Sequence, residues 1–252
     1  MADAMTVQLA ILFAVAVWAG IQNALAGGGT FLTLPALMLT NMTALAANIT
    51  STIALFPGQV ASSWGGREHV VGAGGLSFRQ LLVISLAGGI VGAVLLLVTP
   101  SSIFSHMVPW LVLFATSVFA YGSFVPRKAD RPPVLGTVGA GIAQFCISVY
   151  GGYFGGGIGF LMLAALTAAG LSIRGASATK NVLAGVMNAS AVAIFVFSPQ
   201  VHWLQAAIAC VGAVIGGWIG GHLVSRVNQT FLRAAAVAIG IALTIGLFLR
   251  AP

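Results

Sequence analysis

Long apolar runs separated by short polar segments dominate the chain. Each long run approaches the roughly 20 residues that an α-helix needs to cross about 30 Å of hydrocarbon. The clearest runs predict helices near residues 6–25, 76–98, 103–124, 135–153, 201–224 and 231–249. The pattern therefore predicts an all-α polytopic membrane protein.

Two triple-glycine runs interrupt this pattern, at residues 27–29 and 155–157. A continuous helix is unfavourable there, because each glycine costs about 1 kcal/mol relative to alanine inside a helix. We therefore expect short helices to begin after the breaks, at 30–40 and 158–170. Irregular backbone within a membrane is tolerated only where protein or a water-filled cavity surrounds it.

Other glycines have the spacing that is typical of close helix packing, and we expect them to serve the scaffold. They are Gly88, Gly92, Gly216, Gly217, Gly220 and Gly221.

The chain repeats itself around these breaks. AGGGTFLTLPALML (26–39) matches FGGGIGFLMLAALT (154–167), and AANITSTIALFPGQ (46–59) falls on GASATKNVLAGVMN (175–188). The second match pairs Thr50 with Thr179, Ser51 with Lys180 and Gln59 with Asn188. We expect one membrane domain, 1–252, with a first repeat at 1–124, a cytoplasmic linker at 125–134 and a second repeat at 135–252. Each repeat holds a glycine-broken helix pair followed by three longer helices.

The distribution of cations favours an inverted second repeat. If each broken pair enters the membrane and returns to the same side, the second half is inverted relative to the first. With the N-terminus outside the cell, eight cations then lie on the cytoplasmic side and only Arg250 lies outside, as the positive-inside rule prefers. The eight are Arg67, Arg79, Arg127, Lys128, Arg131, Arg174, Arg226 and Arg233. If the two halves had the same orientation, the cations would divide less cleanly between the two sides of the membrane. The count does not distinguish full crossings from re-entrant hairpins, since both have the same parity. Two oppositely oriented breaks would meet near the bilayer centre, where many transporters of this architecture bind substrate.

Composition narrows the function. Hydrophobic residues make up 59% of the chain and charged residues 5%, against roughly 25% charged in soluble domains. The net charge of +7 comes from scattered cations and one short linker rather than a basic stripe, so no nucleic-acid partner is expected. Neither the histidines nor the cysteines show metal-ligand spacing, and no catalytic pair stands out. We therefore expect no metal, no cofactor and no enzymatic activity.

Lys180 is the most informative single residue. A lysine at membrane depth costs roughly 2.5 to 3.5 kcal/mol on insertion scales, and it normally faces a cavity and has a partner. The alternative is that its long stem carries the ammonium to the interface. The three acids of the chain, Asp3, Glu68 and Asp130, fall in the predicted terminus and loops. A bound anion is then the natural partner, and we favour the cavity.

The expected anion site combines the Lys180 ammonium with two other kinds of group around the paired breaks. Helix N-termini present free N–H groups and the positive end of the helix dipole, and neutral polar side chains suit the oxygens of an oxyanion. Each glycine run could instead serve close packing, and each polar residue could instead join helices. The predicted substrate-binding residues are Lys180, Asn181, Thr179, Asn48, Thr50, Ser51, Gln59, Asn188, Gly27, Gly28, Gly29, Gly155, Gly156 and Gly157.

These motifs resemble the TauE/SafE sulfite exporter family, also called the TSUP anion permeases. The likeness rests on two glycine-rich breaks, each followed by a short apolar helix and an A-x-x-T-type segment, AANITS at 46–51 and GASATKN at 175–181. The resemblance implies a bacterial inner-membrane carrier of small sulfur-containing anions, such as sulfite or organosulfonates like sulfoacetate. Ser51 stands where the other repeat has Lys180, so the site is expected to be asymmetric, with one formal charge.

The expected mechanism is export by alternating access. An inside-negative potential favours outward movement of an anion by about 2.3 kcal/mol per charge per 100 mV. An anion channel would use similar positive groups along a continuous pore, and uptake of the same anions is a further alternative. The sequence leaves the particular anion, the coupling ion and the oligomeric state open.

Overall fold

A computed structural model describes residues 2–25, 28–64, 67–124, 133–223 and 229–250. In these ranges the chain forms ten α-helices and one short 3-10 helix, and no β-sheet. The all-helical prediction is therefore confirmed. Residues 125–132 of the predicted linker lie outside the described residues.

Both halves have the same order of elements. The first half contains α1 (Ala2–Leu25), α2 (Thr30–Met38), α3 (Ala44–Trp64), η1 (Arg67–His69), α4 (Phe78–Val98) and α5 (Ser101–Phe124). The second contains α6 (Thr137–Tyr153), α7 (Ile158–Ala168), α8 (Ile173–Phe195), α9 (Trp203–Leu223) and α10 (Gln229–Arg250). The short helices α2 and α7 begin directly after the glycine runs, where the sequence predicts them.

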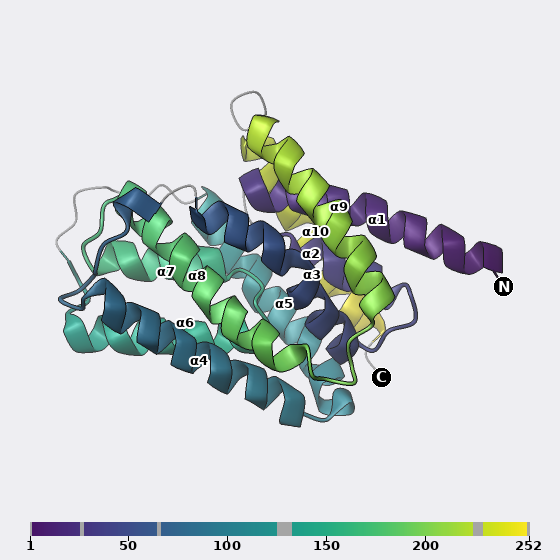
Figure 1. The fold of residues 1–252 in the computed structure, drawn as a ribbon, viewed down its shortest axis with the longest axis horizontal. Coiled ribbons are helices and arrows are strands. Elements are labelled where there is room, and N and C mark those ends of the chain that lie inside the picture. The colour runs from purple at the N-terminus through teal and green to yellow at the C-terminus, as the bar shows by residue number, and fades with distance from the viewer. Residues whose placement is uncertain (1, 26–27, 65–66, 125–132, 224–228, 251–252) are drawn as a thin grey trace.

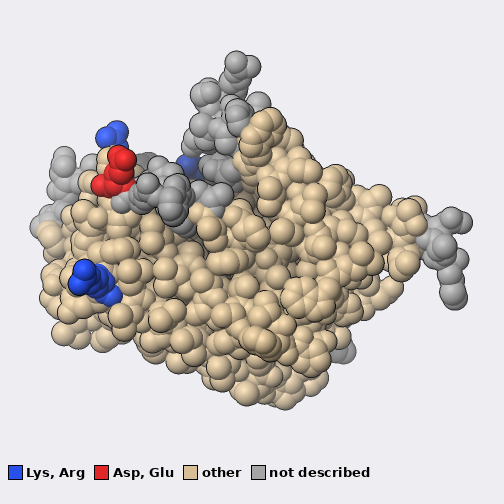
Figure 2. Space-filling view, viewed as in Figure 1, with Lys and Arg blue, Asp and Glu red and all other residues tan. Residues whose placement is uncertain are grey.

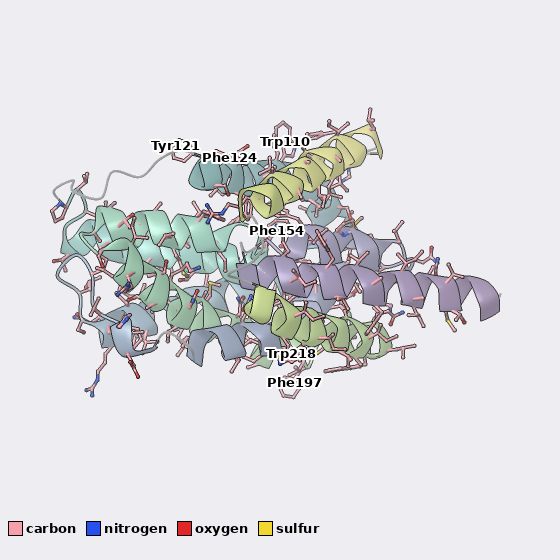
Figure 3. All side chains as sticks on the ribbon, turned by 90° about the horizontal axis from the view of Figure 1, so that it is seen from above. Trp110, Tyr121, Phe124, Phe154, Phe197 and Trp218 are labelled. Carbon is pink, nitrogen blue, oxygen red and sulfur yellow. The ribbon has the colours of Figure 1, made fainter. Side chains whose placement is uncertain are left out.

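The surface is that of a protein surrounded by lipid. Five helices in the described part of the chain are long and apolar enough to cross a membrane, within Met5–Asn23, Phe78–Val98, Ser101–Phe124, Ile173–Phe195 and Trp203–Gly220. Figure 3 shows Trp110, Tyr121, Phe197 and Trp218 pointing outward, and Phe197 is 86% exposed. Figure 2 shows a face of mostly uncharged side chains, with the charged atoms toward one end and the upper edge. So many exposed large apolar groups would be an aggregation hazard in water.

Helices of the two halves pack closely through glycine. On α9, Gly216 lies against the backbone of Val17 on α1, and on α4, Gly92 lies against Val149 on α6. Gly88 makes a similar approach to Ser148. The scaffold prediction is thus confirmed at these three glycines and wrong at Gly217, where an added Cβ would meet nothing within 4 Å. Helix α1 packs along α9 as α6 packs along α4.

Other helix contacts also recur between the halves. The α2–α3 and α1–α2 contacts have counterparts in α7–α8 and α6–α7. The helices α5 and α10 run antiparallel, because Trp110 stacks edge-on against Phe248, with ring centroids 5.0 Å apart, while Thr116 lies against Gly240. In Figure 1, α4, α6, α7 and α8 lie to the left and α1, α9 and α10 to the right, with α2, α3 and α5 between them.

We expect Gly216→Ala to destabilise the protein and Gly217→Ala to leave it at least as stable as the parent. A Cβ at position 216 would overlap the Val17 carbonyl oxygen, whereas a Cβ at position 217 would meet nothing within 4 Å. Overpacking typically costs about 1 to 3 kcal/mol, while alanine in open space gains helix propensity. Thermal unfolding of the two purified variants in detergent measures the difference. Equal melting temperatures would contradict the close α1–α9 packing.

Candidate anion-binding cavity

A cavity of about 360 Å³ lies between the two glycine breaks. The first half contributes side chains or backbone from α1, the start of α2, α3 and α5, namely Asn23, Gly28, Thr30, Gln59 and Phe119. The second half contributes the start of α7 and parts of α8 and α10, namely Gly155, Gly157, Ile158, Gly159, Phe160, Leu163, Ser177, Lys180, Asn181, Ala184 and Arg233. Both halves of the chain therefore build one site.

The glycines at the cavity wall adopt backbone conformations that side chains disfavour. Gly28 has a φ of 87°, and Gly157 has a φ of 73°. A left-handed residue with a Cβ costs roughly 1 to 2 kcal/mol. These turns let α2 and α7 start at the cavity. In the first turns, the N–H groups of Phe31, Leu32 and Phe160 bond to the carbonyls of Gly28, Gly29 and Gly157, so the N–H groups of Thr30, Ile158 and Gly159 are the ones that their own helices leave without a partner. The breaks thus bring two helix N-termini, each with a positive dipole end, to the same cavity.

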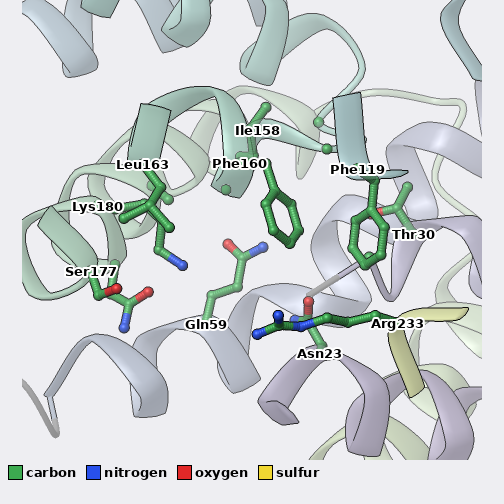
Figure 4. A pocket seen from close by; sticks show the side chains of 16 residues that line it. Asn23, Thr30, Gln59, Phe119, Ile158, Phe160, Leu163, Ser177, Lys180 and Arg233 are labelled. Atoms are coloured by element: carbon green, nitrogen blue, oxygen red, sulfur yellow. The ribbon is translucent and has the colours of Figure 1, made fainter. Parts of the chain in front are cut away.

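Lys180 projects from α8 toward the first turn of α7. Its side chain is half-buried, and its Nζ lies 3.7 Å from the position that a Cβ of Gly159 would occupy. Glycine at position 159 therefore leaves the space beside the ammonium open. The ammonium lies at the cavity wall, and Figure 4 shows it pointing inward.

Arg233 is a second cation of the cavity, and the sequence analysis assigned it only to a cytoplasmic end. It lies on α10, and Figure 4 shows its guanidinium approaching from the side opposite Lys180, with Gln59 between the two. One signal was available, because position 233 falls inside the apolar run predicted as a helix at 231–249. Asn23, near the end of α1, was also missed.

The cavity is electrostatically positive. None of its described lining residues carries a carboxylate. Of the three acids, Glu68 is exposed in η1, Asp3 belongs to the first turn of α1, and Asp130 lies outside the described residues. A cation beside a helix N-terminus is unfavourable by roughly 0.3 to 1 kcal/mol. An anion in the cavity would complement both the cations and the helix dipoles.

The remaining predicted site residues divide into two groups. Gln59 and Asn181 line the cavity together with Lys180, and Gly28, Gly155 and Gly157 form part of its wall. Seven others are not among its described lining residues, namely Thr179, Asn48, Thr50, Ser51, Asn188, Gly29 and Gly156. Gly27 lies outside the described residues.

Two of the residues away from the wall hold loops against helices. The Thr50 hydroxyl accepts a hydrogen bond from the backbone N–H of His202 at 3.3 Å, and the Thr179 hydroxyl accepts one from Val71 at 3.1 Å. Thr50 and Thr179 are matched positions of the repeat. The same interaction thus occurs once in each half, joining a helix to the segment that precedes α9 or α4.

The other polar residues join the central helices. Asn48 donates from Nδ2 to the backbone carbonyl of Tyr153 at 3.1 Å, and Asn188 donates to Oε1 of Gln59. The hydroxyls of Thr33 and Ser51, both fully buried, are 2.6 Å apart. Gln59 therefore belongs both to the cavity wall and to a contact between α3 and α8.

Aromatic rings lie at the cavity wall and close to the breaks. Phe154, the residue that follows α6, is only 2% exposed and lies centrally in Figure 3. Phe119 and Phe160 flank the cavity with ring centroids 4.7 Å apart, and Phe119 also contacts Phe31 at 5.9 Å. These rings reduce the water around the charged groups, which strengthens electrostatic interactions there.

Comparison with known proteins agrees with this architecture. The family model described as "Sulfite exporter TauE/SafE" matches residues 12–247. A "Probable membrane transporter protein" of Haemophilus influenzae (strain ATCC 51907 / DSM 11121 / KW20 / Rd) is 29% identical over 242 residues, which cover 94% of this chain and 92% of that protein. The "Probable membrane transporter protein YfcA" of Escherichia coli (strain K12) is 28% identical over 234 residues, or 92% of this chain and 86% of the relative.

A third relative, the "Probable membrane transporter protein ORF9" of Sinorhizobium sp, is 28% identical over 248 residues, which cover 95% of this chain and 92% of that protein. The family and these relatives are transporters and not enzymes. With its apolar helices and the family match over nearly its whole length, the chain belongs to the TauE/SafE sulfite exporter family and is an integral membrane transporter.

Proposed function

We propose that this transporter exports small sulfur-containing anions, sulfite or organosulfonates such as sulfoacetate, across the bacterial inner membrane by alternating access. The observation that carries the proposal is the cavity in which Lys180 and both glycine breaks meet, with no carboxylate among the described lining residues. The substrate class follows from the family description, and the charge of the cavity accords with it.

The cavity chemistry suits a tetrahedral or pyramidal oxyanion. Lys180 offers three donors, while the amide groups of Gln59 and Asn181 each offer two. Charge-assisted hydrogen bonds to an oxyanion are roughly twice as strong as neutral ones. The first turns of α2 and α7 add backbone N–H groups, which bind anions at helix N-termini in many proteins. Together these groups surround an anion without competing for protons.

An inverted relation between the halves is supported by matched contacts. Thr50, early in α3, bonds to the segment after α8, while Thr179, early in α8, bonds to the segment after α3. These two helices, equivalent in the repeat, therefore run in opposite directions, as do α5 and α10. The matched residues Gln59 and Asn188 bond to one another, as expected for positions close to a twofold axis.

The two halves also differ in a way that alternating access would produce. In the second half, Lys180 of α8 lies beside Gly159 of α7 at the cavity wall. At the corresponding place in the first half, α2 and α3 are joined by the buried Thr33–Ser51 hydrogen bond. In this mechanism the α2–α3 contact opens when the α7–α8 side closes, so that the anion meets one side of the membrane at a time.

The cavity lies toward the cytoplasmic side in the proposed topology. It includes Ser177 and Arg233, which are close to the starts of α8 and α10, and Gln59 near the end of α3. Arg174 and Arg67 lie at those same helix ends, which the positive-inside rule places in the cytoplasm. An anion would load from the cytoplasm, and the membrane potential would favour its release outside.

We expect Lys180→Gln and Lys180→Ala to reduce sulfite efflux from proteoliposomes at least tenfold. Each removes a charge-assisted interaction worth roughly 1.5 to 3 kcal/mol. The matched control is Arg174→Gln, which removes an exposed cation on the same helix outside the cavity. Full efflux in both Lys180 variants would refute the proposed site.

The same vesicles separate a carrier from a channel. A carrier should show saturable efflux and countertransport, in which excess unlabelled sulfite on one side drives labelled sulfite against its gradient. A linear flux without countertransport would support the channel. A transporter must also release sulfite that is chemically unchanged, whereas an enzyme would convert it to a product.

We further expect a disulfide between Thr33→Cys and Ser51→Cys, in a chain with Cys146 and Cys210 replaced by serine, to stop transport. The two hydroxyl oxygens are 2.6 Å apart, so the introduced thiols lie within bonding reach. Oxidation should lock α2 to α3, and a reductant should restore efflux, while each single cysteine variant should stay active. Undiminished efflux from the fully oxidised double variant would show that α2 and α3 need not separate.

A further inference from the structure

We infer that Arg233 is a specificity-determining residue: together with Lys180 it makes the site select doubly charged anions over singly charged ones. This rests on the proposed function, because it assigns a charge class to the anion that occupies the same cavity. The sequence analysis expected an asymmetric site with one formal charge, whereas the cavity wall contains two permanent cations, one from α8 and one from α10.

The position of Arg233 is not that of an ordinary topology signal. A cation that marks the cytoplasmic side extends to the headgroups or to water. Arg233 instead lines the cavity, its side chain is only partly exposed, and its Nε is shielded from solvent. In Figure 4 the guanidinium points inward toward Gln59, from the side of the cavity opposite Lys180.

Packing of α10 holds Arg233 in this position. Gly240 allows α10 to lie directly against Thr116 of α5, and the Trp110–Phe248 ring contact fixes the far end of the helix. Helix α10 also contacts α2 of the first half. The guanidinium is thus placed by the body of the protein rather than by a loop.

Charge balance then distinguishes anions. Two like charges facing one small cavity repel each other, and the surrounding Phe119 and Phe160 rings limit screening by water. Each cation attracts a doubly charged anion about twice as strongly as a singly charged anion at the same position, because the Coulomb energy is proportional to the charge. The planar guanidinium also binds two oxygens at once, in a geometry that lysine does not reproduce. Sulfite and sulfoacetate both have doubly charged forms.

Sulfate and methanesulfonate are the matched probes, because they share a tetrahedral sulfur and differ in one formal charge. Binding of each to the full-length protein in detergent is measured by isothermal titration calorimetry at constant ionic strength. We expect the parent to bind sulfate at least tenfold more tightly than methanesulfonate. Arg233→Gln should weaken sulfate binding tenfold or more and methanesulfonate binding less than threefold, so that the preference disappears.

Two further variants test the explanation. Arg233→Lys keeps the charge and should retain most of the preference, while Arg174→Gln removes an exposed cation outside the cavity and should leave both affinities unchanged. A parent that binds both probes equally overturns the inference even if Arg233→Gln does not fold. Equal weakening of both probes by Arg233→Gln, or the same loss from Arg174→Gln, overturns it as well.

The outcomes also separate this inference from the proposed function. A parent that binds neither probe and moves neither sulfite nor sulfoacetate in vesicles contradicts both. A parent that transports sulfite through Lys180 but shows no preference for the doubly charged probe contradicts only the role of Arg233.

Discussion

Positive charge in a cavity that both halves of the chain build is the constraint on which the rest of the structure depends. Lys180 and Arg233 reach the same cavity, and the lining residues described there bring no carboxylate to neutralise them. Charge that is removed from water is costly unless polar groups surround it, so Lys180 and Arg233 need polar neighbours, and a bound anion is favoured. Gln59 and Asn181 are such neighbours. A bound anion offsets the electrostatic cost of these two cations, and this gain in energy favours binding of the substrate.

The glycine breaks make that cavity possible. A pair of continuous helices would present only side chains to the centre of the protein, whereas α2 and α7 begin there and expose backbone N–H groups. Left-handed turns at Gly28 and Gly157 permit these starts. Around them the scaffold is built from close glycine contacts between α1 and α9 and between α4 and α6. Both breaks reach the cavity, and the buried Thr33–Ser51 hydrogen bond joins α2 to α3 in the first half, where the second half has Lys180 at the position that matches Ser51.

Much of the fold could be predicted from the sequence, because short sequence patterns mark the helices and breaks of each repeat. Apolar run length and the glycine runs placed α2 and α7 within two residues of their observed ends, at Met38 and Ala168. Lys180 could be singled out because a charge within an apolar helix is rare. Arg233 could not be assigned to the cavity, since its role depends on how α10 packs against the rest of the chain. Thr50 and Thr179, conversely, lie in a promising motif but bond to loop backbone. One sequence does not reveal such distant contacts.

The central claim is that an anion occupies the space between the two breaks. The most direct measurement is an experimental structure of the protein with selenite, a heavier analogue of sulfite whose selenium can be located by anomalous scattering. The account predicts one strong selenium peak within hydrogen-bonding distance of the Lys180 ammonium, which is lost in Lys180→Gln. A peak only at the protein surface, or one that persists unchanged in the variant, would contradict it.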